Sequence, residues 1–91
     1  MRLIDSHCHF DAAEFDADRA AVQARTRAAG VTDQIVPAVD AAGWPKLKTI
    51  CAAQTGLHPA YGLHPMYLDQ HQRKHLDELR HWVERETPVA V

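Results

Sequence analysis

Short apolar segments alternate with helix-forming segments along the whole chain, and this alternation limits the possible fold more than any other feature. Gly30 and Gly56 stand where a left-handed residue ends a helix. Strand–helix units joined by short connections build a parallel sheet that helices cover, so the sequence predicts an α/β fold. Helices are expected over residues 16–29, 44–53 and 75–86, and strands over residues 3–9, 33–39 and 60–63, with a fourth strand beginning over residues 88–91.

The length of the chain bears on which α/β fold this is. An open doubly wound sheet and a (β/α)8 TIM barrel share the same local pattern, but a barrel takes about 250 residues. The 91 residues suffice for three βα units and the start of a fourth strand. We interpret residues 1–91 as the N-terminal part of a single domain, an incomplete TIM barrel.

Composition and charge narrow the classes of function. Apolar residues make up 46% of the chain and charged residues 24%, as in ordinary globular domains. With a net charge of −2, the chain lacks a broad basic surface, so a nucleic-acid partner would have to be bound locally. Two cysteines are too few for a disulfide scaffold, and no secretory signal or membrane-spanning run is present. We expect a cytoplasmic protein without a membrane partner.

The segment LIDSHCHFD places two histidines one residue apart at the polar end of the first predicted strand. Because side chains alternate along a strand, His7 and His9 are expected to converge. Asp5 and Asp11 share that side, whereas Cys8 points to the other side and packs. The carboxyl ends of parallel strands carry ligand sites, and imidazole suits divalent transition metals. We predict that His7 and His9 bind a metal and that the aspartates orient them, although His-x-His alone is also a common coincidence.

A Leu-His-Pro sequence occurs on both sides of the third predicted strand. His58 enters this strand and His64 leaves it. In parallel α/β proteins the leaving end carries the chemistry and the entering end contributes stability. We therefore expect only His64 to lie near His7 and His9, and His58 to be structural. A histidine beside a turn-forming proline is also an ordinary loop residue.

The remaining histidines are weaker candidates. His71 and His75 have the spacing of a helical metal-binding pair, but Gln72 stands where such a motif carries its glutamate. We expect a solvated helix face there and no role for His81. The sequence contains no Gly-rich phosphate loop, nucleophile elbow or CxxC motif.

Taken together, LIDSHCHFD, GLHP at residues 62–65 and the βα periodicity between them resemble the beginning of a TatD-type metal-dependent deoxyribonuclease. GLHP is the more specific mark, because amidohydrolases and polymerase-and-histidinol-phosphatase-type phosphoesterases share His-x-His. The resemblance implies a TIM barrel that holds two divalent metal ions at the carboxyl ends of its strands. Zinc, magnesium and manganese are the metals that it suggests. It assigns His7 and His9 as metal ligands and His64 as a residue that holds substrate phosphate or lines the metal pocket.

The resemblance also implies an activity and its limits. The activity is hydrolysis of DNA phosphodiester bonds, in single strands or at 3′ ends, by metal-activated water. The family's Gly-Glu pair after the fourth strand, two later histidines and a late aspartate are absent from these residues. No catalytic constellation is complete, and we expect the 91-residue chain alone to be inactive. Two alternatives stay open: an amidohydrolase acting on an amide or ester, and a non-catalytic truncated remnant.

Overall fold

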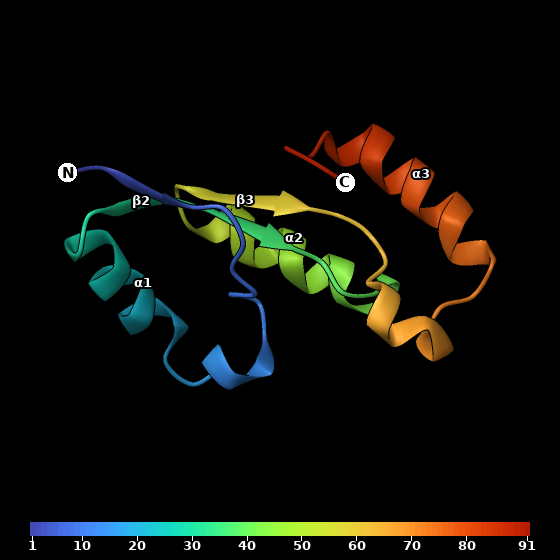
Figure 1. Cartoon of the computed structure of the whole chain (residues 1–91), viewed down its shortest axis with the longest axis horizontal. Helices are drawn as coiled ribbons and strands as arrows, with labels where there is room; N and C mark the ends of the chain where they lie inside the picture. Colours follow the sequence, from blue (N-terminus) through green and yellow to red (C-terminus); the bar gives the residue numbers. More distant parts are fainter.

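A computed structural model describes all residues, 1–91, as a parallel sheet flanked by helices (Figure 1). The strand order is β1-β2-β3, and both neighbouring pairs run parallel, as in consecutive βα units of a barrel. The strands are β1 (Leu3–Asp5), β2 (Val31–Pro37) and β3 (Leu57–Ala60). The helices are α1 (Arg19–Ala28), α2 (Trp44–Ala53) and α3 (Lys74–Glu86), with 3-10 turns η1 (Ala13–Phe15), η2 (Ala41–Gly43) and η3 (Pro65–Gln70).

Most of the predicted elements are present, some with shifted ends. α2 has its predicted bounds, and α3 begins one residue earlier than predicted. α1 is shorter because the residues before it form η1 and a turn. β2 begins and ends two residues earlier, with Pro37 as its last residue, where a missing N–H disturbs the sheet least. Gly30, with a φ angle of +98°, follows the C-cap of α1 as predicted, whereas Gly56, with a φ angle of +89°, lies three residues beyond the end of α2 and does not cap it.

The third strand is where the sequence prediction is wrong. β3 occupies Leu57–Ala60 and not residues 60–63. Gly56 turns the chain into the sheet just before the strand, and its positive φ brings its backbone against the carbonyl of Thr32. Pro59 is tolerated because β3 is the outer strand of this sheet. His58 therefore lies inside the strand and not in front of it.

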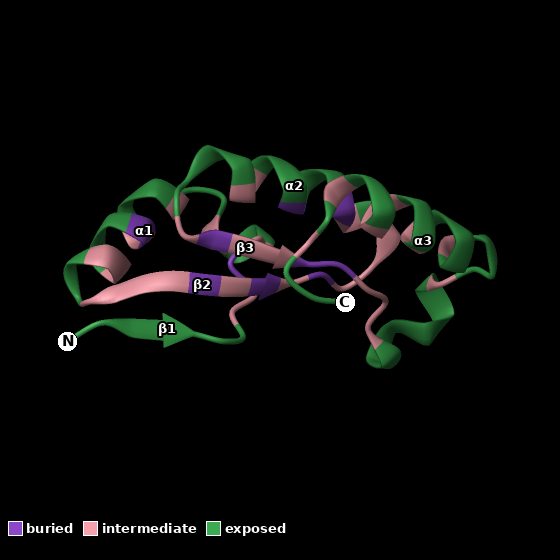
Figure 2. Cartoon of the chain, turned by 90° about the horizontal axis from the view of Figure 1, so that it is seen from above, coloured by how far each residue is buried: buried purple, intermediate pink, exposed green.

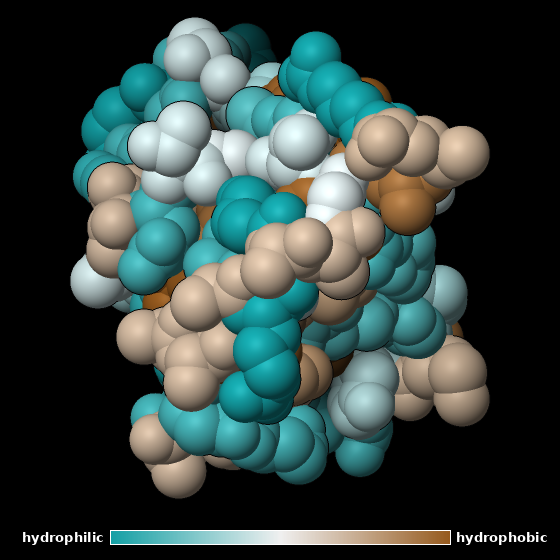
Figure 3. All heavy atoms as spheres, turned by 90° about the vertical axis from the view of Figure 1, so that its left-hand side faces the viewer, coloured by the Kyte–Doolittle hydropathy of each residue, from teal (hydrophilic) through white to brown (hydrophobic).

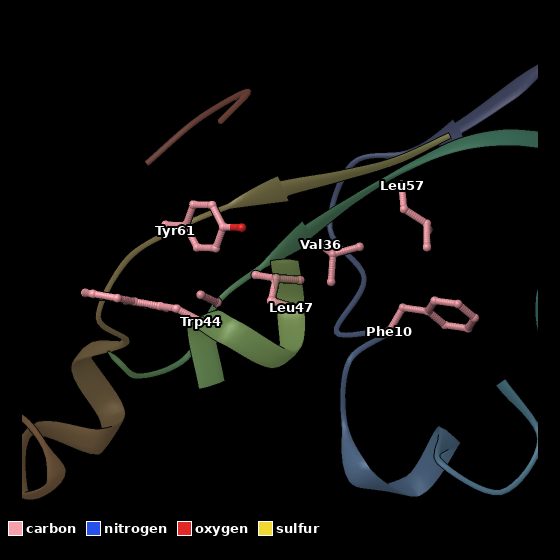
Figure 4. Close-up of a cluster of buried hydrophobic side chains, with 7 residues drawn as sticks. Phe10, Val36, Trp44, Leu47, Leu57 and Tyr61 are labelled. Atoms are coloured by element: carbon pink, nitrogen blue, oxygen red, sulfur yellow. The ribbon is translucent and has the colours of Figure 1, made fainter. Parts of the chain in front are cut away.

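The hydrophobic core lies between the strands and α2. Its buried side chains, shown in Figure 4, are Phe10, Val36, Ala38, Trp44, Leu47, Leu57 and Tyr61. Val36 and Leu47 have no exposed surface, and Phe10 and Tyr61 are each 1% exposed. Phe10 follows the His-x-His segment directly, so its burial anchors that segment to the folded core.

α3 joins this core through Leu79, Trp82 and Val83. The Trp82 ring lies 5.9 Å from the Trp44 ring and 5.6 Å from the Tyr61 ring, measured between centroids. Lys48 of α2 and Glu86 of α3 form an ion pair of 3.1 Å beside it. None of the helices combines the length and the apolar character that crossing a membrane requires.

β1 and the C-terminal segment carry exposed apolar side chains at the edges of the sheet, and both are drawn as exposed in Figure 2. Leu3 and Ile4 are 46% and 61% exposed. The predicted fourth strand is present only as a single parallel bridge between Ala60 and Ala90, and Val91 is 77% exposed. The open sheet edges expected of an incomplete barrel are thus part of this structure.

Candidate metal centre

The chain between β1 and the core positions the two histidines. β1 ends at Asp5, whose carboxylate accepts the backbone N–H of His7 at 3.1 Å. The backbone N–H of Cys8 then donates to the carbonyl of Ile35 at 3.0 Å, which ties this segment to β2. His7 and His9 lie on either side of this attachment point. Their position at the carboxyl end of the strand is therefore set by backbone bonds and by the burial of Phe10.

The imidazoles of His7 and His9 face each other as predicted. Their Nε2 atoms lie 3.2 Å apart, and their rings are 4.9 Å apart between centroids and 84° from parallel. Two nitrogen ligands at about 2.0–2.1 Å from a tetrahedral zinc ion lie about 3.3–3.4 Å from each other. The separation thus fits two ligands of one divalent ion.

The hydrogen bond on the far side of the His9 ring fixes its tautomer. His9 Nδ1 lies 3.1 Å from the carbonyl oxygen of Pro37, the last residue of β2. A carbonyl only accepts, so Nδ1 carries the proton and Nε2 keeps its lone pair. Metal-bound histidines are commonly oriented in this way, by an acceptor on the second nitrogen. His9 is therefore ready to bind a metal through Nε2.

The aspartates do not orient the imidazoles as the sequence predicted. Asp5 lies beside the Cys8 thiol, in a groove that neither histidine lines. The strand ends at Asp5, so the alternation of side chains does not continue to the histidines. Asp11 makes no hydrogen bond to either ring, although it is close enough for the charge of His9 to act on it. Burial raises the pKa of the Asp11 carboxyl, and its own backbone N–H and His9 oppose that rise.

Cys8 points away from the histidines and packs beside the core, as predicted. Burial raises the pKa of its thiol, which disfavours the thiolate that a metal would require. The chain contains no group of three or more His, Cys, Asp or Glu side chains arranged to hold a metal. Within these residues the site therefore consists of His7 and His9.

His64 lies at the same edge of the sheet but not in the pair. Its backbone N–H donates to the carbonyl of Val39, two residues beyond the carbonyl that binds His9. Its Nδ1 accepts the backbone N–H of Met66 at 3.1 Å and so caps η3. The neutral ring then carries its proton on Nε2 and presents a hydrogen-bond donor. The side chain lines a separate groove between β3 and α3, and no hydrogen bond joins it to His7 or His9.

His71 and His75 are used within the loop and do not form a pair. His71 lies before α3, and its Nε2 donates to the carbonyl of His64 at 2.7 Å. His75 Nδ1 accepts the backbone N–H of Gln72 at the start of α3. Both histidines thus make local hydrogen bonds to the backbone, and their spacing of four residues does not mark a metal-binding pair.

His58 belongs to the opposite end of the sheet. Its Nε2 lies 2.9 Å from Asp33 Oδ1, while Arg2 and Thr32 bind Asp33 Oδ2 at 3.1 and 2.7 Å. These bonds, with that of His58 the largest influence, hold the pKa of the Asp33 carboxyl well below its usual range. Figure 3 views the molecule from this end, where hydrophilic atoms are spread over the face and strongly hydrophobic ones lie in recesses and at one margin.

Similarity to known proteins agrees with this geometry. Residues 4–91 match the family model of the TatD related DNases. The chain belongs to this family. It is 38% identical over 90 residues to the uncharacterized metal-dependent hydrolase YjjV of Escherichia coli K12, across 99% of this chain and 35% of YjjV. The crystal structure of YjjV, a TatD homologue, matches with a TM-score of 0.87 and 38% identity, over 92% of this chain and 32% of that one.

The TatD-family match confirms the α/β fold and its barrel character. This chain spans about a third of the length of the relatives that it matches. The groups that sequence reasoning missed are the carbonyls of Pro37 and Val39, which hold His9 and His64. Backbone carbonyls leave no mark in a sequence, so no signal pointed to them.

Proposed function

We propose that this TatD-family protein is a metal-dependent hydrolase that cleaves phosphodiester bonds of DNA, with His7 and His9 as ligands. The proposal is supported above all by the two Nε2 atoms, 3.2 Å apart, and by the Pro37 carbonyl that leaves the His9 lone pair free. When bound, divalent ions such as zinc, magnesium or manganese supply activated water and polarise the phosphoryl oxygen. Sites of this kind use three or four protein ligands, so the full site takes residues beyond these 91.

The role of His64 follows from its tautomer. Its Nδ1 is occupied by the N–H of Met66, so Nε2 offers a proton and no lone pair. A hydrogen-bond donor suits a phosphate oxygen and not a metal ion. We assign His64 to the substrate phosphate, beside the metal-bound pair and not within it.

The proposed substrate is single-stranded DNA or DNA 3′ ends, held at this site. A net charge of −2 gives no broad electrostatic attraction for a duplex backbone, so local contacts have to provide the binding affinity. The cytoplasm is the proposed compartment, and no membrane partner is part of this proposal.

The test uses the natural protein expressed over its whole reading frame. It should cleave a single-stranded oligonucleotide in a metal-dependent manner, and His9→Ala should abolish that cleavage. Faster turnover of amide or ester substrates, with the same dependence on His9, would instead identify an amidohydrolase.

A polypeptide of residues 1–91 alone is the comparison sample. It should show no turnover, because two imidazoles do not complete a metal site. Cleavage by this shorter polypeptide that is lost in its His9→Ala variant would contradict the proposed need for further ligands. Absence of any hydrolysis by the whole protein would favour a non-catalytic remnant.

A further inference from the structure

An exposed apolar surface lies directly beside His64, in η3. Met66, Tyr67 and Leu68 are 83%, 42% and 71% exposed, whereas Leu63 and Leu79 pack against the core. Donation of one hydrogen bond to a phosphate requires none of these side chains. An apolar surface at this position can accept an apolar group of the ligand beside the phosphate.

Tyr67 is held in a fixed position relative to His64. Its ring lies 5.5 Å from the His64 ring, edge to face at 74°. The Tyr67 backbone N–H donates to the carbonyl of His64 at 3.1 Å, and His71 Nε2 donates to the same carbonyl at 2.7 Å. A break in the helical backbone at Tyr67, with φ −117° and ψ 34°, separates it from the turn before it. The hydrogen bonds that close the loop on the His64 carbonyl thus hold the Tyr67 ring next to the His64 imidazole, whose Nε2 is a hydrogen-bond donor.

Basic residues follow the same loop. Arg73 and Lys74 come two and three residues after His71, where the chain has returned to His64. Both are exposed, and neither takes part in an ion pair. Tyr67 and these two cations, at opposite ends of the loop that His71 closes on His64, supply the two groups by which proteins bind single-stranded nucleic acid, a stacking side chain and basic charge. Figure 1 places this segment, in orange, at the end toward which β3 points.

We propose that Met66, Tyr67, Leu68, Arg73 and Lys74 form a binding strip for single-stranded nucleic acid, the η3 strip. A base stacks on Tyr67 between the two aliphatic neighbours, while its phosphate accepts the hydrogen bond of His64 Nε2. Arg73 and Lys74 neutralise the following phosphates. This inference rests on the proposed function and adds to it how the strand is recognised.

The test compares two oligonucleotides of equal charge on the natural protein over its whole reading frame. One carries thymine bases, the other abasic sites, and binding is followed by fluorescence anisotropy in EDTA to prevent cleavage. Tyr67→Ala should reduce the preference for the base-bearing strand about tenfold, within the range of one stacked base. Tyr67→Phe keeps the ring and should retain the preference.

The charged half of the strip has its own measurement. Arg73→Ala with Lys74→Ala should reduce the slope of log affinity against log salt by about 1.4, the value for two phosphate contacts to a single strand. Arg80→Ala, on the exposed side of α3 and paired with Glu84, is the matched control and should not change the slope.

Two results would overturn the η3 strip. One is a Tyr67→Ala effect of equal size on both oligonucleotides, since the residue would then only shape the loop around His64. The other is an unchanged salt slope in the Arg73 and Lys74 variant. If cleavage still depends on His9 in either case, the proposed function stands and the strip alone fails. Cleavage that is independent of His9 would refute the proposed function, whatever Tyr67 does.

Discussion

The two ends of the sheet use histidine in opposite ways. At the carboxyl end, the Nε2 atoms of His7 and His9 lie 3.2 Å apart, and each has only the other as its hydrogen-bond partner. At the amino end, Nε2 of His58 is bound to the carboxylate of Asp33, which Arg2 also contacts. A divalent ion could replace the contact between the two imidazoles, whereas the bond between His58 and Asp33 completes a set of stabilising bonds.

The difference shows what decides the role of a histidine. His58 and His64 both stand between leucine and proline, so their immediate neighbours do not distinguish them. What separates them is the group on each ring nitrogen: a carboxylate on His58 and a backbone N–H on His64. Strand direction places each ring at its own end of the sheet and thereby selects that group.

The largest expected effect concerns metal binding at the carboxyl end. Replacing both ligands, as His7→Ala with His9→Ala, should weaken zinc binding more than about a hundredfold, because even groups that only orient ligands contribute 10–100-fold. Isothermal titration calorimetry of the whole protein measures this. The proposed contrast between the two ends of the sheet fails if the double variant binds zinc as tightly as the unchanged protein.

A matched control keeps this result specific. His81→Ala removes an exposed histidine of α3 whose Nδ1 interacts only with the carbonyl of Asp77. It should leave zinc affinity unchanged. A similar loss in His81→Ala would point to scattered surface binding and not to a centre.

The next effect separates the two Leu-His-Pro histidines. His64→Ala should lower kcat/KM about 10–100-fold, the range for a positioning group, with a small loss of thermal midpoint from the capping bond to Met66. His58→Ala should leave kcat/KM unchanged and lower the thermal midpoint, because it removes a partner of Asp33 at the amino end of the sheet. Steady-state kinetics and thermal melting of both variants, at equal metal content, decide the point. Greater catalytic damage from His58→Ala at unchanged stability would invert the assignment of the two ends.

The sequence predicted the class of fold and the convergence of His7 and His9, because both depend on local patterns. Helix periodicity, the glycine stop at Gly30 and the His7–His9 spacing are all visible within a few residues. The position of β3 was not predictable in this way. Leu57 to Ala60 contains a proline and a histidine and resembles a turn, and only parallel pairing with β2 makes it a strand. Tertiary contact outweighed local preference there.

The partners of the histidines were equally hidden. Alternation predicts that Asp5 and Asp11 orient the two histidines, but the strand ends at Asp5 and the pattern does not extend further. The true partner of His9, the Pro37 carbonyl, comes from a strand 28 residues away. Likewise nothing in the sequence joins His58 to Asp33, which meet because β2 and β3 are neighbours.

The smallest expected effect tests the amino end through pH. Because the folded protein holds the pKa of Asp33 below its usual range, the ionised carboxylate stabilises the folded state. This contribution is complete above the unfolded pKa of about 3.9 and is lost as the pH falls below it. Asp33→Asn should therefore lower the urea midpoint at pH 7, and the difference in midpoint from the unchanged protein should shrink as the pH falls below 4.

Asp69→Asn, which changes an exposed carboxyl without an ion pair, should show no such convergence. A gap between Asp33→Asn and the unchanged protein that stays constant as the pH falls below 4 would mean that the Asp33 contacts do not stabilise this end.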